Sequence, residues 1–387
     1  MNPNAKIPRG VWVLGFVSLL SDLSSEIVHS LLPLYLTVGL GASALVVGLI
    51  EGVAEAVSLV VRIFSGTLSD RLRHRKWIAA AGYGLGAAAK PLFALASGPW
   101  LVFGARFIDR IGKGIRGAPR DALIADLTPR EIQGAAYGLR QSLDTVGALA
   151  GPLVAMALML AWHDDFRAVF WVAVIPGVLA FALVAFGVRE PERPAGAVNA
   201  PSLWTGFREL PRAFWLVTLA GAALTLARFS EAFLILRAEN VGVPLAYAPL
   251  VLAGMSVVYM VTAYPAGVIA DRMARPLLLA IGTAILVAAD IVLAFAAGPV
   301  ALALGVALWG LHMGLTQGLL AAMVAASVPA HLRGTGFGAF NLASGLAMLV
   351  ASALAGALWH YVGPAATFWA GAALASAAVV LTRFARP

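Results

Sequence analysis

The chain has no cysteine and few charged residues. The absence of cysteine among 387 residues excludes disulfides, thiolate metal ligands and thiol catalysis. Charged residues make up 12% of the chain and hydrophobic residues 61%, whereas soluble domains are about one-quarter charged. Too few charges are present to cover a water-exposed surface. This composition is typical of a protein embedded in a membrane.

Several motifs of enzymes and of ATP-driven proteins are also missing. The sequence has no G-x-x-x-x-G-K-[ST] loop, so we expect no direct use of ATP. It has no G-x-S-x-G or H-E-x-x-H sequence either. The string Gly112-x-Gly114-x-x-Gly117 has the spacing of a dinucleotide fingerprint, but it follows no predicted strand. The sequence therefore predicts neither an enzyme nor a protein with a cofactor.

Long apolar runs recur along the whole chain. A membrane-crossing helix needs about 20 mostly apolar residues, and about twelve such runs are present. The predicted spans are 10–38, 44–67, 77–97, 99–123, 134–161, 166–187, 213–237, 246–268, 276–297, 299–327, 335–360 and 364–384. We predict an all-α, polytopic membrane protein with an N-terminal six-helix bundle (1–188), a cytoplasmic linker (189–212) and a C-terminal six-helix bundle (213–387).

Basic residues gather in the loops on one side of the predicted membrane. They cluster at 71–76, 189–212 and 272–275, whereas the opposite side has only Arg167 and Arg237. Since Lys- and Arg-rich short loops stay in the cytoplasm, we expect both termini to be cytoplasmic and the protein to lie in the cytoplasmic (inner) membrane. The net charge of +8 is then a feature of topology, and no nucleic-acid partner is expected.

Short sequence patterns recur in the two halves at a nearly constant offset. The recurring pairs are 129–138 with 329–338, 66–71 with 267–272, and Ser25-Glu26 with Ser230-Glu231. Two repeated six-helix halves are the ground plan of many secondary transporters, which bind the substrate between the halves. The repeat therefore favours transport over a receptor or an intramembrane enzyme.

The segment 66–75 resembles the loop 2–3 signature of the major facilitator superfamily, G-x-L-x-D-R-x-G-x-[RK]. Arg73 replaces the last glycine, and the matching residues are Gly66, Leu68, Asp70, Arg71 and Arg75. The resemblance covers essentially the whole chain and implies two pseudo-symmetric six-helix bundles that work by alternating access. It also implies gating by Gly66, Asp70, Arg71 and Arg75, and by their repeats Gly267, Asp271 and Arg272. The alternative is that the basic residues only set the topology.

A second pattern, Gly138-x8-Gly147-x3-Gly151-Pro152, resembles the antiporter motif of drug/proton exporters. Its final glycine pair is replaced by Ala155-Met156. The resemblance implies proton-coupled export of a small organic solute, with the bilayer, the solute and protons as partners of a monomer. The alternative is close helix packing, because Gly147-x-x-x-Gly151 is also a helix-packing motif.

Ionisable residues at bilayer depth are costly unless they face a cavity or a partner. Asp22, Glu26 and His29 form one helical stripe at i, i+4 and i+7 of span one. In the resembled fold, spans one, four, seven and ten line the central cavity. Further ionisable residues lie on spans four, five and seven: Arg106, Asp109, Arg110, Lys113, Arg116, Arg120, Arg140, Asp144, Arg228 and Glu231.

We assign roles to these residues by their chemistry. Asp22, Glu26 and Asp144 are predicted to take up protons, because a change of basic neighbour can switch a buried carboxyl between its two forms. The predicted substrate ligands are His29, Asp109, Arg110, Lys113, Arg140, Arg228 and Glu231. Glu51, Glu55, Arg62 and Lys90 are weaker candidates on more peripheral spans. The alternative is a purely structural network that locks the bundle.

Two other transport functions fit the same residues. A proton symporter would bind an anionic nutrient at Arg110 and Lys113. Divalent-metal efflux would use His29 with Asp22 and Glu26, although the basic span four repels cations, and no metal site is predicted.

Overall fold

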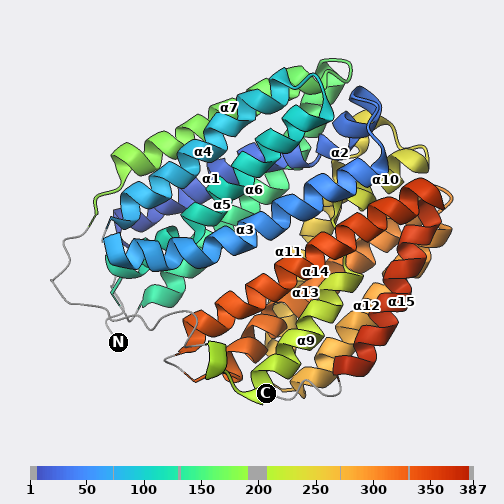
Figure 1. Cartoon of the computed structure of the whole chain (residues 1–387). Coiled ribbons are helices and arrows are strands. Elements are labelled where there is room, and N and C mark those ends of the chain that lie inside the picture. Colours follow the sequence, from blue (N-terminus) through green and yellow to red (C-terminus); the bar gives the residue numbers. More distant parts are fainter. Residues whose placement is uncertain are drawn as a thin grey trace. The chain divides into compact units, whose positions relative to one another are not determined.

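The computed structural model describes residues 7–72, 74–129, 132–190, 207–270, 272–329 and 332–382. Within these ranges the chain is almost entirely helical and contains no strand (Figure 1). Eleven helical segments of this described part are long and apolar enough to cross a membrane. A twelfth helix, α5 (Pro99–Leu127), has 29 residues and is long enough, but its charged stripe lowers its hydropathy. The predicted all-α, polytopic fold is therefore confirmed.

The contacts divide the chain into two compact units. Unit 1 comprises residues 1–32 and 57–200, and unit 2 comprises residues 33–56 and 201–387. This grouping places residues 33–56 with the C-terminal half. The predicted boundaries of the two bundles, at 188 and 213, stay a prediction.

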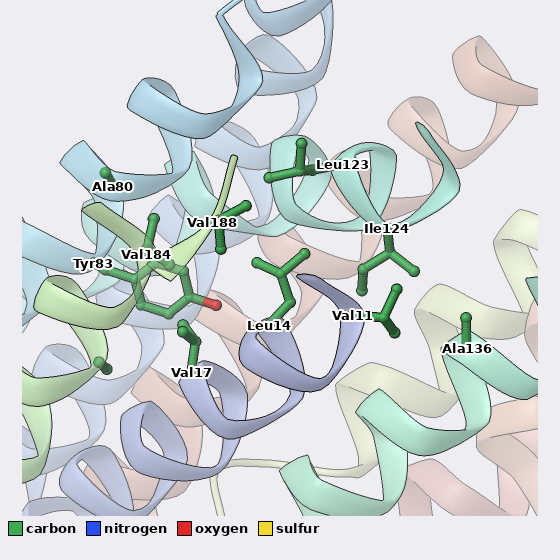
Figure 2. Close-up of a cluster of buried hydrophobic side chains, with 11 residues drawn as sticks. Val11, Leu14, Val17, Ala80, Tyr83, Leu123, Ile124, Ala136, Val184 and Val188 are labelled. Atoms are coloured by element: carbon green, nitrogen blue, oxygen red, sulfur yellow. The ribbon is translucent and has the colours of Figure 1, made fainter. Parts of the chain in front are cut away.

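Unit 1 is built from long helices that pack around a common core. Its helices are α1 (Arg9–His29), α4 (Arg75–Leu95), α5, α6 (Gln133–Ala161) and α7 (Phe166–Ala182), which continues as a π-helical turn, η3 (Leu183–Gly187). Figure 2 shows one end of this core, where Leu14 and Val17 of α1 meet Tyr83 of α4 and Val184 of η3. In a bilayer, where lipid tails are as apolar as the side chains, close packing of this kind holds helices together. It also fixes which face of each helix turns inward.

Unit 2 holds the remaining helices, and one of its spans is broken. α9 (Arg212–Ala227) and α10 (Ala232–Asn240) form one span with a non-helical break at residues 228–231. The other long helices are α11 (Leu250–Ala270), α12 (Arg275–Phe295), α13 (Pro299–Ala326), α14 (Arg333–Tyr361) and α15 (Pro364–Thr382). Short elements are α2 (Leu32–Leu34), which begins at the last residue of unit 1, η1 (Tyr35–Gly39) and η4 (Leu245–Tyr247).

One helix, α3 (Ala44–Leu72), belongs to both units. In its first half, Gly48 lies against the backbone of Ser352 and Gly356 of α14, where a Cβ atom would collide. In its second half, the Ser65 hydroxyl donates a hydrogen bond of 2.9 Å to the carbonyl oxygen of Gly114 of α5. Small residues thus let α3 approach a different neighbour in each unit.

The repeat in the sequence is also visible in the helix boundaries. α4 begins at Arg75 and α12 at Arg275, while α5 begins at Pro99 and α13 at Pro299. A glycine in extended conformation precedes each of these prolines, which occupy the first helical turn, where the missing N–H costs nothing. An offset of 200 residues therefore relates these helices of unit 1 to those of unit 2.

Candidate functional site

Most of the charged side chains of helix α5 are buried inside unit 1. Arg106, Asp109, Arg110 and Arg116 are all buried, with relative exposures of 1–6%, whereas Lys113 is exposed. Such burial requires partners, because an isolated charge away from water is very costly. The partners come from α1, α4 and α6.

A deeply buried ion pair joins α4 to α5. Lys90 Nζ lies 2.8 Å from Asp109 Oδ1, and both side chains are less than 5% exposed. Lys90 also donates a hydrogen bond of 3.3 Å to the Ser25 hydroxyl of α1. Arg110 Nε lies 4.0 Å from the other oxygen of Asp109. Asp109, a predicted substrate ligand, is therefore engaged inside unit 1 by two bases.

The acidic stripe of α1 faces these bases, as its spacing predicts. Glu26 Oε2 lies 3.4 Å from His29 Nδ1 and also interacts electrostatically with Lys113 and Arg110. Asp22 Oδ1 lies 3.9 Å from Arg116 Nη2, a long distance for an ion pair. Glu26 is thus more firmly engaged than Asp22.

Helix α6 completes the arrangement next to Asp22. Arg140 Nη2 lies 3.0 Å from Asp144 Oδ1, one turn further along the same helix. Arg140 and Arg120 both donate to the Ser18 hydroxyl of α1, each at 3.4 Å. Asp144 also lies close enough to Asp22 to interact with it electrostatically. Two carboxyl groups and several bases therefore share one region of unit 1.

We call these side chains the unit 1 polar network. Its members are Asp22, Glu26, His29, Lys90, Asp109, Arg110, Lys113, Arg116, Arg120, Arg140 and Asp144. The structure brings together every predicted proton-coupling residue and all predicted ligands of the N-terminal half.

The network has one accessible corner. The side chains of Asp22 and Glu26 are 25% and 24% exposed, and Lys113 is exposed. By contrast, Lys90, Asp109 and Arg110 are nearly inaccessible. We call Asp22, Glu26 and Lys113 the open corner, because these side chains are the most exposed ones of the network.

Two glycines of the motif Gly138–Pro152 are packing residues. A Cβ atom at Gly147 would collide with the carbonyl oxygen of Leu19, and one at Gly151 would collide with Glu26. At Gly138, in contrast, a Cβ atom would meet no described residue within 4 Å. Gly147 and Gly151 thus hold α6 against α1 beside the acidic stripe, and Pro152 lies in the same buried stretch.

The glycine contacts predict opposite effects for two substitutions in one motif. Gly147→Ala should lower the stability of the protein by about 1–3 kcal/mol, because the new methyl group overpacks the α1–α6 contact. Gly138→Ala should be neutral or stabilising by up to about 1 kcal/mol, because alanine favours the helix. Thermal unfolding of the two purified variants measures both. Equal destabilisation would contradict the packing role.

In unit 2, the predicted ligands Arg228 and Glu231 lie at the two ends of the α9–α10 break. Arg228 interacts electrostatically with Glu231, with Tyr259 of α11 and with Glu55 of α3. His312 of α13 lies close enough to interact with Arg228 as well. Glu55, a weaker candidate in the sequence, therefore belongs to a second charged group around the break.

The predicted gating residues are only partly described. Asp271, and the side chains of Asp70 and Arg71 that follow Gly66 in α3, lie outside the described part, whereas Gly267 and Arg272 are exposed. Arg75 Nη1 donates to both carboxylate oxygens of Asp126, each at 2.9 Å. This ion pair joins the start of α4 to the end of α5, and the gating roles stay predictions.

Several partners in the network escaped prediction. Ser18 carries no charge and belongs to no motif, so nothing in the sequence singles it out, and Ser25 is marked only by the repeated pair Ser25-Glu26. Lys90 stands out as a lysine within an apolar span, which is the available signal. Within the described residues, no three His, Cys, Asp or Glu side chains gather closely enough to hold a metal ion.

Comparisons with known proteins agree on one family. The sequence model of the Major Facilitator Superfamily matches residues 14–350 and 217–387. An uncharacterized MFS-type transporter of Methanocaldococcus jannaschii is 31% identical over 98% of this chain and 95% of its own length. The multidrug resistance protein MdtH of Photorhabdus laumondii is 29% identical over 61% of this chain and 58% of its own length. The crystal structure of the nucleoside transporter NupG has a TM-score of 0.75 at 15% identity, over 97% of this chain and 98% of that one.

Proposed function

Since the chain belongs to the major facilitator superfamily, we propose that this membrane transporter is a proton-coupled antiporter that exports a small organic solute. The observation that carries the proposal is the open corner, where Asp22 and Glu26 face an exposed Lys113. Similarity to a multidrug resistance protein over 61% of the chain supports export of a drug-like or secreted compound. The proposal includes a place in the cytoplasmic membrane with both termini cytoplasmic, which the basic loops support.

The geometry suggests how a proton and a solute would be exchanged. Asp22 makes a long contact of 3.9 Å with Arg116 and lies near a second carboxylate, Asp144. A proton on Asp22 removes the repulsion between these two carboxylates, since like charges in one site disfavour double ionisation. A solute bound at the open corner would compete with that proton. Proton and solute then bind in turn and not together, which is the requirement for antiport.

Protonation of Asp22 also removes a negatively charged partner from Arg116 and Lys113. Arg116 stacks its guanidinium on the Tyr83 ring, with 4.8 Å to the ring centroid, and so has a second partner when Asp22 is protonated. Lys113 has no such ring contact among the described residues and interacts with both Asp22 and Glu26. We assign Lys113 as the base that changes partner during the cycle.

Export makes a prediction for cells and for purified protein. Cells that produce the transporter should accumulate less of an exported probe than cells without it, and a protonophore should abolish the difference. The probes are ethidium, tetraphenylphosphonium and benzoate, which cover lipophilic cations and an organic anion. In weakly buffered solution, adding the exported probe to purified protein should release protons, as read by a pH indicator dye.

The alternative outcome points to the second candidate function. Because Lys113 is exposed and Arg110 lies nearby, an anion could bind at the same corner. A proton symporter would raise accumulation of benzoate, and benzoate binding would take up protons instead of releasing them. That result would replace export by symport of an organic anion.

A further inference from the structure

Unit 2 contains a buried acid that takes no part in the groups described above. Asp290, in the second half of α12, has a relative exposure of 0%. Neither of its carboxylate oxygens has a hydrogen-bond partner among the residues that the structure describes. Asp109 of unit 1, by contrast, has Lys90 beside it.

The surroundings of Asp290 are apolar and tightly closed. Gly371 of α15 lies so close that a Cβ atom there would be 2.6 Å from Asp290 Oδ2 and 2.9 Å from the Phe229 ring. The Phe229 ring in turn contacts Trp309 of α13 and Phe368 of α15, with centroid distances of 5.3 and 5.6 Å. The carboxyl group therefore borders an aromatic cluster, with no room for a solvation shell.

The internal repeat shows which residues of unit 1 correspond to Asp290 and to the position opposite it. With the offset of 200 residues, Asp290 of α12 corresponds to Lys90 of α4, and Trp309 of α13 corresponds to Asp109 of α5. In unit 1 these two positions form the 2.8 Å ion pair. In unit 2 the first position carries an acid and the second carries an uncharged indole. The acid thus occupies the buried place of the pair without a base opposite it.

The charged groups of the neighbouring elements leave Asp290 without a counter-ion in the described part of unit 2. Nδ1 of His312 of α13 lies 2.7 Å from the carbonyl oxygen of Gly282. Gly282 precedes Asp290 by about two turns of α12. Arg237 of α10 donates to the carbonyl oxygens of Leu293, Ala294 and Ala296 at the end of α12. Arg228 and Glu231 interact with each other at the α9–α10 break. α15 has no ionisable residue within Pro364–Thr382.

We infer that Asp290 is a proton-binding site of unit 2, separate from the acids of α1. A carboxyl group in such a place takes up a proton, because an isolated carboxylate away from water is far less favourable than the neutral acid. The aromatic surroundings are consistent with a neutral acid, because they offer a charged carboxylate no polar partner. The inference concerns proton binding alone, and it stands whether the transporter exports or imports its solute.

Infrared spectroscopy of the purified full-length protein tests the inference. The wild type, Asp290→Asn and the control Asp164→Asn are compared in H2O and D2O at neutral pH. Asp164 is exposed and has a positive φ of 65°, which asparagine tolerates. We expect the spectrum of the wild type minus that of Asp290→Asn to contain a protonated carboxyl C=O band that shifts in D2O. The spectrum of the wild type minus that of Asp164→Asn should contain ionised carboxylate bands, with the amide bands of the new asparagine, and no protonated carboxyl band.

Stability supplies a second readout. Because asparagine is a neutral isostere of a protonated aspartate, Asp290→Asn should fold, and it should melt like the wild type at about pH 4, where the aspartate of the unfolded chain also holds its proton. As the pH rises from about 4 through neutral, the wild type should lose melting temperature relative to Asp290→Asn, because its unfolded chain gives up a proton that the folded protein keeps on Asp290. Ionised carboxylate bands in the Asp290 difference spectrum would overturn the inference. So would misfolding of Asp290→Asn, because that result would show that the charge is needed.

Discussion

The double replacement of Asp22 by Asn and Glu26 by Gln is expected to abolish transport driven by a pH gradient while leaving solute exchange intact. Both side chains belong to the open corner, and both are partly accessible. Asn and Gln keep the shape and the hydrogen-bonding capacity of the acids but cannot exchange a proton. A carrier without its protonatable groups can still alternate when solute is present on both sides.

The test uses proteoliposomes in two assays, with ethidium as the probe if it proves to be exported. Gradient-driven accumulation should disappear in the double variant, and counterflow of labelled against unlabelled probe should continue. Asp164→Asn, on an exposed turn, is the control and should retain both activities. Normal gradient-driven transport by the double variant would show that the protons are carried elsewhere.

The single variants should differ in size of effect. The contact of Asp22 with Arg116 is 3.9 Å long, whereas Glu26 lies 3.4 Å from His29 and interacts with two further bases. The less firmly engaged acid is better placed to exchange a proton, so Asp22→Asn should cause most of the loss.

Breaking the Lys90–Asp109 pair is expected to give the largest loss of stability in unit 1. The two charged atoms are 2.8 Å apart, and the side chains are 3% and 4% exposed. Removing one partner of a buried pair strands the other charge, which typically costs about 3–5 kcal/mol. Lys90→Met and Asp109→Leu should each show a loss of this size.

The double variant separates pairing from packing. Lys90→Met combined with Asp109→Leu removes both charges together, so most of the lost stability should return, since apolar replacements of a buried pair are often neutral or stabilising. Arg62→Gln provides a control, because Arg62 is 49% exposed and lies 3.7 Å from Asp121; its loss should stay below about 1 kcal/mol. Reversible unfolding in detergent measures all four. A double variant as unstable as the single ones would show that each charge has another essential partner.

Much of the fold follows from the sequence because a bilayer imposes a simple length rule on apolar helices. The run at 99–123 corresponds to α5, Pro99–Leu127, and the run at 10–38 corresponds to α1 with its extension to Gly39. The break at residues 228–231 was not predictable from hydropathy, because Arg228 and Glu231 interrupt an apolar run without any proline or glycine between them. The packing of Gly48 on α14 joins positions about 300 residues apart, which no local pattern encodes.

The candidate site was predictable in part for a similar reason. Helical periodicity places Asp22, Glu26 and His29 on one face, and in the structure this face meets α5. Periodicity gives no information on which residue of another helix stands opposite. For that reason Lys90 is among the weaker candidates in the sequence, although it forms a deeply buried ion pair with Asp109. Asp290 could have been found by applying the 200-residue offset to Lys90.

The division of α3 between the two units has a consequence for biosynthesis. The first half of this helix needs α14, and residues such as Ser352 and Gly356 leave the ribosome long after Gly48 does. Until then, the early helix has an exposed stripe of small residues within the lipid. Completion of the C-terminal unit therefore waits for the end of translation, because contacts between such distant residues form late. A nascent chain halted before α9 would contain a helix, α3, whose neighbour α14 has not yet been made.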